Sequence, residues 1–285
     1  MEIQAPAKIN LFLDVIGKRT DGYHELRSLM CPIGIYDTVR LSCEPADTPA
    51  DITVACTHPD VPSGRANLAW SAASAFFAET GFSARTTVAI DKHIPVGAGL
   101  GGGSSDAAAV LAGLNRFFNH PLSTDRLMSI GRCLGADVPF FIHGRPALAT
   151  GIGEKLSPWP DLPLFYLVLI YPNCPVSTGE VYKKLNLALT KNKKITTKFT
   201  FESGWEADFA RQLYNALEAP AMQLCPEIRQ AKQALMNSGA LASLMSGSGS
   251  SVFGIFEDAG QAGKAFDALS ERCHSWQVFQ TRLLY

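Results

Sequence analysis

The stretch PVGAGLGGGSSDAA, residues 95–108, combines residue types that could bind phosphate groups. Five glycines come first, and a pair of serines and a short alanine run follow. Glycine loses more conformational freedom on folding than any other residue, so a cluster of glycines needs a reason. Either the loop adopts backbone angles that are closed to other residues, or another group approaches its main chain closely.

The flanking residues indicate that this group is a phosphate. Residues 87–90 have the composition of a strand, and apolar residues recur at helical spacing after Asp106, with Ser104 or Ser105 as the expected helix cap. A helix N-terminus attracts anions, and a glycine loop lets several N–H groups converge on one phosphate. The alternative is a tight connection that binds nothing. The residues expected to contact phosphate are Pro95, Val96, Gly97, Ala98, Gly99, Leu100, Gly101, Gly102, Gly103, Ser104 and Ser105.

The best-known phosphate loops do not fit this stretch. Gly97, Gly99 and Gly102 match G-x-G-x-x-G, but a dinucleotide-binding fold usually places that pattern in its first strand–helix turn. A Walker A loop has a lysine before its serine, whereas Gly103 precedes Ser104. The HRD and DFG motifs of protein kinases do not occur in the sequence. We therefore expect a phosphate loop of another kind.

Composition and charge restrict the function classes. The chain has 285 residues, which suggests about two domains, and a formal net charge of −1, which gives no electrostatic case for binding nucleic acid. The basic cluster at residues 183–198 is interpreted as a solvated loop. No apolar run reaches the roughly 18 residues of a membrane span, and the N-terminus is typical of a strand rather than a signal peptide. We expect a cytoplasmic protein.

The seven cysteines carry no metal or disulfide signature. They are widely scattered, with no CxxC pair and no Cys/His pair at zinc spacing. Their odd number and wide spacing predict free thiols in a reducing compartment.

Regular elements are predicted on both sides of the glycine loop. Residues 8–16 alternate as a strand does, with Lys8, Asn10, Phe12 and Asp14 on one face. Asp21-Gly22 then predicts a turn into returning strands. Residues 66–69 begin an amphipathic helix that ends near residue 81.

Asp137 is predicted to lie at a bend. Pro139 disfavours helical angles at the residue before it, so Val138 is expected to be extended. Asp137 would then lie outside any helix.

A domain boundary is predicted where three prolines occur within residues 157–164. The domains would span residues 1–160 and 161–285. The second is expected to hold a strand at 165–172, helical patterns at 208–237, a hairpin at 240–256, a helix at 260–272 and a strand near 276–284. This order of elements predicts an α+β fold.

Three motifs together resemble those of the GHMP kinases. They are the Lys-x-Asn strand at residues 8–10, the glycine loop, and S-G-S-G at residues 246–249. The segments APAKINL (5–11), RTDGYHE (19–25) and GADVPFF (135–141) are similar to one branch of this superfamily. Its members transfer the γ-phosphoryl group of ATP to the 2-hydroxyl of a cytidylyl diphosphate alcohol, in the methylerythritol phosphate route to isoprenoids. The similarity runs nearly from end to end.

The resemblance implies a two-domain α+β GHMP-kinase fold. Its N-terminal domain would hold a mixed sheet with helices, its C-terminal domain would be ferredoxin-like, and the active site would lie in the cleft between them. The glycine loop would wrap the phosphates of ATP, the co-substrate, with Mg²⁺ as the accompanying metal. The metal ligands stay open, with Asp106 as one candidate, and Asn67 and Lys92 are weaker candidates for contacts with ATP.

The resemblance also implies a catalytic pair. Asp137 would accept the proton of the substrate hydroxyl, because an alcohol is a poor nucleophile. Lys8 would stabilise charge and keep Asp137 ionised, since a nearby cation lowers a carboxyl pKa. The alternative for Asp137 is a turn or helix cap before Pro139, and the alternative for Lys8 is a lysine at a strand edge.

The substrate residues are carried over in the same way. The cytosine would lie between His24 and an aromatic ring from the start of the second domain, for which we choose Tyr182. The family more often has phenylalanine there, and the alternative is that Tyr182 is a core residue. Asn10 and Tyr23 are expected to contact the substrate.

Two other functions are weighed against this one. Another small-molecule kinase of the superfamily, of the mevalonate or homoserine type, is opposed by the YHE turn and the GADVPFF segment. A catalytically inactive module that binds ATP is opposed by the presence of Lys8 and Asp137. The expected partners are ATP and a small molecule, without nucleic acid or membrane, and the chain would act as a monomer or a weak homodimer.

Overall fold

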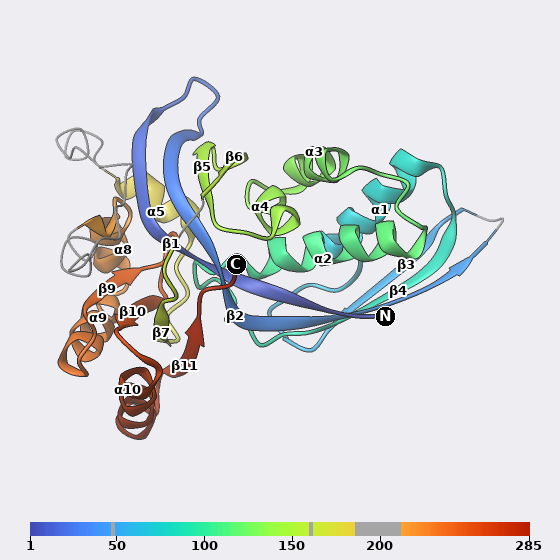
Figure 1. The fold of residues 1–285 in the computed structure, drawn as a ribbon. Coiled ribbons are helices and arrows are strands. Elements are labelled where there is room, and N and C mark those ends of the chain that lie inside the picture. The colour runs from blue at the N-terminus through green and yellow to red at the C-terminus, as the bar shows by residue number, and fades with distance from the viewer. Residues whose placement is uncertain (47–48, 160–161, 186–211) are drawn as a thin grey trace. The chain divides into compact units, whose positions relative to one another are not determined.

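The computed structural model describes residues 1–46, 49–159, 162–185 and 212–285, which form two compact units (Figure 1). The first unit holds Met1–Ala7, Ile35–Val96 and Gly101–Arg145, and the second holds Lys8–Gly34, Gly97–Leu100 and Pro146–Tyr285. The predicted boundary between residues 160 and 161 lies outside the described residues and stays a prediction. Most of the basic cluster at 183–198 and the start of the helical pattern at 208–237 also lie outside them.

Two long strands contribute residues to both units. They are β1 (Glu2–Lys18) and β2 (His24–Pro45). In the turn between them, the N–H of Arg19 donates to the carbonyl of Tyr23 at 2.8 Å, and Gly22 has a φ of 91°. The predicted turn is therefore confirmed, and the returning strands expected after it are one continuous strand.

The first unit combines a mixed sheet with helices. Within it, β4 (Ala84–Asp91) pairs antiparallel with the second half of β2 and parallel with β3 (Asp51–Cys56). A 3-10 turn, η1 (Gly64–Ala66), precedes the first helix. The helices are α1 (Leu68–Thr80), α2 (Gly102–Phe117), α3 (Thr124–Leu134) and α4 (Val138–His143). They share one apolar core with the sheet, which includes Val39, Phe76, Val88 and Leu111.

Two predicted helix boundaries near the glycine loop are wrong. Helix α2 is capped by Gly101, in the left-handed region with a φ of 74°, and not by Ser104 or Ser105, which lie inside its first turn. The left-handed angle, which glycine adopts without strain, lets the helix begin early. Val138 is also not extended, because it begins α4. Proline at a helix start lacks only an N–H group that has no helical partner there.

The second unit contains a ferredoxin-like β-α-β-β-α-β arrangement. In chain order its elements are β7 (Tyr166–Tyr171), α8 (Glu218–Leu224) with α9 (Glu227–Asn237), β9 (Ala242–Met245), β10 (Val252–Phe256), α10 (Ala259–Arg272) and β11 (Gln277–Arg282). The sheet order is β11-β7-β10-β9 with antiparallel neighbours. The predicted fold class is confirmed.

Four shorter elements complete the second unit. They are β5 (Ala147–Gly151), β6 (Lys155–Pro158), α5 (Thr178–Lys184) and β8 (Tyr214–Asn215). Strand β5 pairs with the first half of β2 and with β6, and β8 pairs parallel with β1. Residues on β1, β7, α9 and β10 supply much of the apolar core, including Val15, Ile170, Leu235 and Phe256.

Candidate active site

Parts of all three sequence motifs meet in the second unit. The N–H of Lys8 donates to the carbonyl of Leu100 at 3.0 Å, and the hydroxyl of Ser246 donates to the carbonyl of Gly99 at 3.1 Å. A Cβ at Gly247 would lie 2.7 Å from the Gly99 carbonyl oxygen and 3.1 Å from the Lys8 ammonium nitrogen. A residue larger than glycine at position 247 would clash with these atoms. The S-G-S-G loop therefore lies directly against Lys8 and the glycine loop.

Lys8 is buried and belongs to a chain of polar side chains on β1 and β2. Its ammonium group donates to Asn10 Oδ1 at 2.7 Å, and Asn10 Nδ2 donates to Ser28 Oγ at 2.7 Å. The Ser28 hydroxyl donates to the carbonyl of Phe12 at 2.7 Å. Buried polar groups are stable only when they are hydrogen-bonded, so this series of hydrogen bonds fixes the position of the Lys8 side chain. The alternative, a lysine at a solvated strand edge, does not fit this burial.

The two rings proposed for the nucleobase stack on each other. The centroids of His24, at the start of β2, and Tyr182, in α5, lie 4.8 Å apart with an angle of 25° between the planes. Burial lowers the pKa of His24, and Lys18 lowers it further, so the imidazole is neutral near pH 7. Tyr23, beside His24, is 60% exposed. The second unit therefore brings His24 and Tyr182 together, while their contact with a nucleobase stays a prediction.

In the first unit, a buried lysine joins two carboxyl groups beside the start of α2. Lys92 donates to Asp37 and, at 2.9 Å, to Asp106 Oδ2. The other Asp37 oxygen accepts the N–H groups of His93 and Ile94 at 2.7 and 2.8 Å. Burial raises the pKa of Asp106 to about 7, although Lys92 acts in the opposite direction.

The first turn of α2 also holds two buried oxygens that have no hydrogen-bond partner in the described part of the chain. These oxygens are Ser105 Oγ and Asp106 Oδ1, and neither forms a hydrogen bond with any described residue. A buried polar atom without a partner is rare enough in a folded protein to suggest an unseen ligand. Gly102, just before them, has its missing Cβ directed at the Lys92 ammonium, 2.9 Å away, whereas a Cβ at Gly103 would meet nothing within 4 Å.

Asp137 is the residue immediately before α4 and is half-buried. Its backbone carbonyl accepts the N–H of Phe141 at 3.4 Å, but its side chain makes no capping hydrogen bond. The carboxylate is therefore not used to cap the helix. Asp137 and Lys8 belong to different units, and their pairing stays a prediction.

Asn67, a weaker candidate for contact with ATP, has a structural role. Its Oδ1 accepts the N–H of Ala69 at 2.9 Å, and its Nδ2 donates to the carbonyl of Pro62 at 2.8 Å. The side chain thus caps α1 and, through its bond to Pro62, holds the residues that precede the helix.

The sequence alone assigned no role to Ser28, Asp37, Ser246 or Gly247. Asp37 lies in a strand, where only its polar character among apolar neighbours could have drawn attention. Ser246 and Gly247 belong to a motif that was recognised, but nothing in the sequence places them against Lys8.

The comparisons with known proteins agree with this reading. The GHMP kinases N terminal domain model matches residues 67–145, and the GHMP kinases C terminal model matches residues 205–275. A protein of Syntrophotalea carbinolica named 4-diphosphocytidyl-2-C-methyl-D-erythritol kinase is 45% identical, with 96% of each chain covered. A protein of the same name from Geobacter metallireducens is 42% identical over 100% of this chain and 99% of its own.

Solved structures give the same result for the fold. A crystal structure of 4-(cytidine 5'-diphospho)-2C-methyl-D-erythritol kinase matches with a TM-score of 0.80 and 38% identity, covering 99% of both chains. The homoserine kinase of Cytophaga hutchinsonii matches with a TM-score of 0.73 at 17% identity, covering 100% of this chain and 97% of its own, which is a likeness of fold alone. The two family models and the full-length identity to named relatives lead to one conclusion: the chain belongs to the GHMP kinases, a family of small-molecule kinases.

Proposed function

We propose that the chain transfers the γ-phosphoryl group of ATP to the 2-hydroxyl of 4-diphosphocytidyl-2-C-methyl-D-erythritol, a step in isoprenoid precursor biosynthesis. The observation that carries this proposal is the 42–45% identity, over nearly the whole chain, to relatives named for this kinase. Matches to homoserine and mevalonate kinases, at 17% and 13% identity, support only the shared fold. They give no reason to prefer the other small-molecule kinases.

The glycine loop would bind the phosphates of ATP through its backbone. Gly101 caps α2, so the first N–H groups of that helix, which have no helical partner, are available to an anion. The open space at Gly103 leaves room for a phosphate at the same turn. Leu100 and Gly99 are held to Lys8 and Ser246, so this part of the loop is fixed before ATP arrives.

Lys8 and Asp137 would carry the chemical step. Phosphoryl transfer depends mainly on positioning and on neutralising charge at the transferred group. A buried ammonium held by Asn10 suits the second task, because few waters screen it. Asp137, whose carboxylate is not used as a helix cap, would take the proton from the 2-hydroxyl as the oxygen attacks.

The residues at the start of α2 fit a magnesium ion that accompanies ATP. Mg²⁺ prefers oxygen ligands, and Ser105 Oγ and Asp106 Oδ1 are buried oxygens that no described residue hydrogen-bonds. These two would hold the ion, which would neutralise charge on the phosphates. Lys92 already neutralises part of the Asp106 charge, so the carboxyl does not simply repel a nearby triphosphate.

The nucleobase would insert between His24 and Tyr182. Each stacked contact needs about 3.5 Å between ring atoms, so a base between the rings needs them about 7 Å apart. The present 4.8 Å separation means that the rings must move apart by about 2 Å to admit it. Asn10 and Tyr23 would make further substrate contacts, and the exposure of Tyr23 leaves it accessible.

No helix in the described part of the chain is both long enough and apolar enough to cross a membrane. With ATP and a charged nucleotide as substrates, we propose that the enzyme works in the cytoplasm, as a monomer or a weak homodimer.

A coupled ADP-release assay with purified protein tests the proposal. ADP should form with the diphosphocytidyl alcohol and not with mevalonate or homoserine at equal concentration. Asp137→Asn, which keeps the shape of the side chain, should lower kcat by about 10²–10⁴-fold while the variant still binds ATP. Equal turnover of mevalonate or homoserine would overturn the substrate assignment, and a folded Asp137→Asn variant with normal kcat would remove the base.

A further inference from the structure

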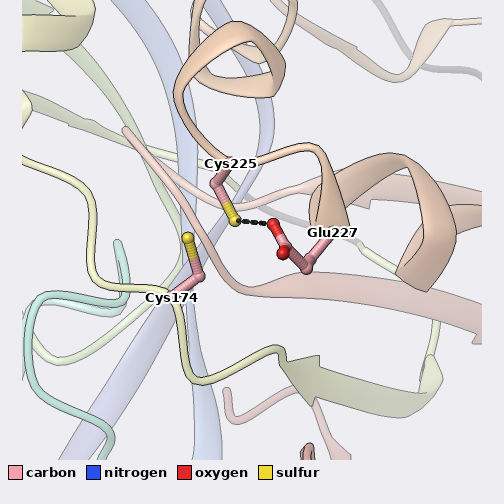
Figure 2. Close-up of side chains that lie close together, drawn as sticks. All are labelled: Cys174, Cys225 and Glu227. Carbon is pink, nitrogen blue, oxygen red and sulfur yellow. Dashed lines mark hydrogen bonds between the residues drawn. The ribbon is translucent and has the colours of Figure 1, made fainter.

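A second cluster of reactive side chains lies in the second unit, outside the candidate active site. Cys174 follows β7, Cys225 ends α8, and Glu227 is the first residue of α9. Figure 2 shows the three side chains turned toward one another from two segments that are far apart in the sequence. Among the described residues, this is the only group of three or more His, Cys, Asp or Glu side chains whose donor atoms lie close enough together to hold a metal ion.

The geometry of the cluster suits a tetrahedral metal site. One donor atom from each residue, two sulfurs and a carboxylate oxygen, lies within 4.8 Å of the other two. Zinc binds thiolate at about 2.3 Å and carboxylate at about 2.0–2.2 Å, so adjacent tetrahedral ligands lie about 3.5 Å apart for sulfur and oxygen. Cys225 Sγ lies 3.4 Å from Glu227 Oε2. This pair needs almost no movement to hold an ion.

The chemistry of the donors selects a class of metal. Two sulfurs and one carboxylate favour a thiophilic divalent ion such as Zn²⁺ and disfavour Mg²⁺, which prefers oxygen ligands. The thiol of Cys225 donates to Glu227, and burial raises the pKa of this thiol, so it keeps its proton when no metal is bound. Because a metal binds the thiolate form of cysteine, binding of an ion should release protons.

The cluster is placed to act on the loop that contacts Lys8. The carbonyl of Cys174 accepts the Ser250 hydroxyl at 2.5 Å, and the N–H of Ser251 donates to the carbonyl of Ala98 in the glycine loop at 3.1 Å. A Cβ at Gly249 would lie 3.6 Å from Ile228, the residue after Glu227. An ion bound by Cys174 and Glu227 would therefore hold together two segments that contact the S-G-S-G loop and would stabilise the position of that loop.

We propose that Cys174, Cys225 and Glu227 form a binding site for one thiophilic divalent metal ion of the zinc class, with a fourth position open to water. The ion is separate from the magnesium that accompanies ATP. Cys225 is fully buried, while Cys174 and Glu227 are half-buried, so the ion enters from their side. The site does not depend on the identity of the phosphorylated alcohol.

Cobalt is the probe, because its bonds to thiolate produce a charge-transfer absorption that oxygen ligands do not. Metal-free, fully reduced protein should bind one equivalent of Co²⁺ with this absorption and release protons, and Zn²⁺ should displace the cobalt. Cys174→Ser and Glu227→Gln should each weaken binding by at least about tenfold. Both residues are half-buried, so these variants are better suited to the test than Cys225→Ser.

Cys133→Ser is the matched control, since Cys133 is an exposed free thiol in α3 of the first unit. It should leave cobalt binding unchanged. The proposal is overturned if reduced protein gives no thiolate absorption, or if a folded Cys174→Ser variant binds cobalt as tightly as the parent. A Cys174–Cys225 disulfide that forms in air and persists in the presence of Zn²⁺ would also overturn it, because the pair would then act as a redox site.

Discussion

The stacked pair of His24 and Tyr182 alters what the nucleobase site must accomplish. In the free chain the two rings already stack with a centroid separation of 4.8 Å. A pair of this kind is worth about 0.5–1.5 kcal/mol beyond its buried area, and a base entering at the proposed site would have to break it. The base would then gain two ring contacts of about 1–3 kcal/mol each. The net benefit of Tyr182 at the proposed site would therefore be smaller than one stacking contact.

Tyr182→Ala should raise KM for the cytidylyl substrate by about 2- to 30-fold, which corresponds to roughly 0.5–2 kcal/mol. The variant loses one contact with the base but no longer has to break the ring pair. KM for ATP should not change. Steady-state kinetics with Tyr182→Phe as the control, which keeps the ring, measures this. Unchanged KM in the alanine variant would mean that Tyr182 only packs against the core of the second unit.

Single residues differ in how far the sequence could predict them. The motif predicts Lys8 and Asn10 as site residues, and the structure joins their side chains by a hydrogen bond at 2.7 Å, while their roles stay predictions. Asp37 could not be identified, because its partner Lys92 lies 55 residues further along, just after β4, and only the fold brings them together. Ion pairs between distant residues leave no local pattern in a sequence.

At the scale of elements, the glycines of the loop turn out to serve different purposes. Gly101 supplies the left-handed angle that starts α2, and Gly102 makes room for the Lys92 ammonium. Gly103 faces open space and has no unusual backbone angle in this structure. Among the described residues, neither backbone geometry nor packing explains a glycine at 103. The proposed approach of the ATP phosphates to the main chain would explain it.

Gly103→Val should therefore raise KM for ATP by at least about tenfold without lowering the melting temperature. Valine fits a helix at least as well as glycine, and a Cβ at this position would lie more than 4 Å from every described atom outside its own turn. Gly102→Val is the contrasting variant, and it should lower the melting temperature, since its Cβ would meet Lys92 and Ile94. If Gly103→Val binds ATP normally, the phosphates do not approach this turn.

The same elements show where periodicity fails as a guide. The start and end of α1 follow from a capping asparagine and a left-handed glycine, so the sequence predicted that helix well. The start of α2 was misplaced because serine is a common cap, and the positive φ of Gly101 leaves no mark in the sequence. Val138 was misplaced because the rule for residues before proline is a tendency that a helix N-terminus overrides.

At the scale of the whole molecule, the order of elements predicted the fold class, but not how the units are assembled. The ferredoxin-like order of the second unit follows from strands and helices that are each visible in the sequence. The division of β1, β2 and the glycine loop between two units depends on long-range pairing. Both faces of β1 are buried from Lys8 to Val15, so the face that carries Lys8, Asn10 and Asp14 is buried as well. The alternation of residues assigns them to two faces but does not show that both are covered.

The buried carboxyl of Asp106 should make the stability of the whole chain depend on pH. Its pKa is about 7 in the folded state, against 3.8 as the ordinary value, because burial outweighs the effect of Lys92. Between about pH 4 and pH 7 the folded chain keeps a proton on Asp106 that the unfolded chain has lost. Stability contributed by this group therefore falls as the pH rises through that window, by no more than about 1.4 kcal/mol per pH unit.

Other groups titrate in the same range with the opposite sign. Burial lowers the pKa values of His24 and His143, which makes the folded chain more stable as the pH rises through them. The effect of Asp106 must therefore be isolated as a difference between the parent and Asp106→Asn, which has no proton to lose.

Urea unfolding at pH 5, 6, 7 and 8 should show the parent losing stability relative to the variant up to about pH 7 and levelling off above it. Asp125→Asn, which removes an exposed carboxyl from the start of α3, is the control. A parent that instead gains stability over the variant as the pH rises would mean that Lys92 holds Asp106 ionised, and that its ammonium outweighs burial.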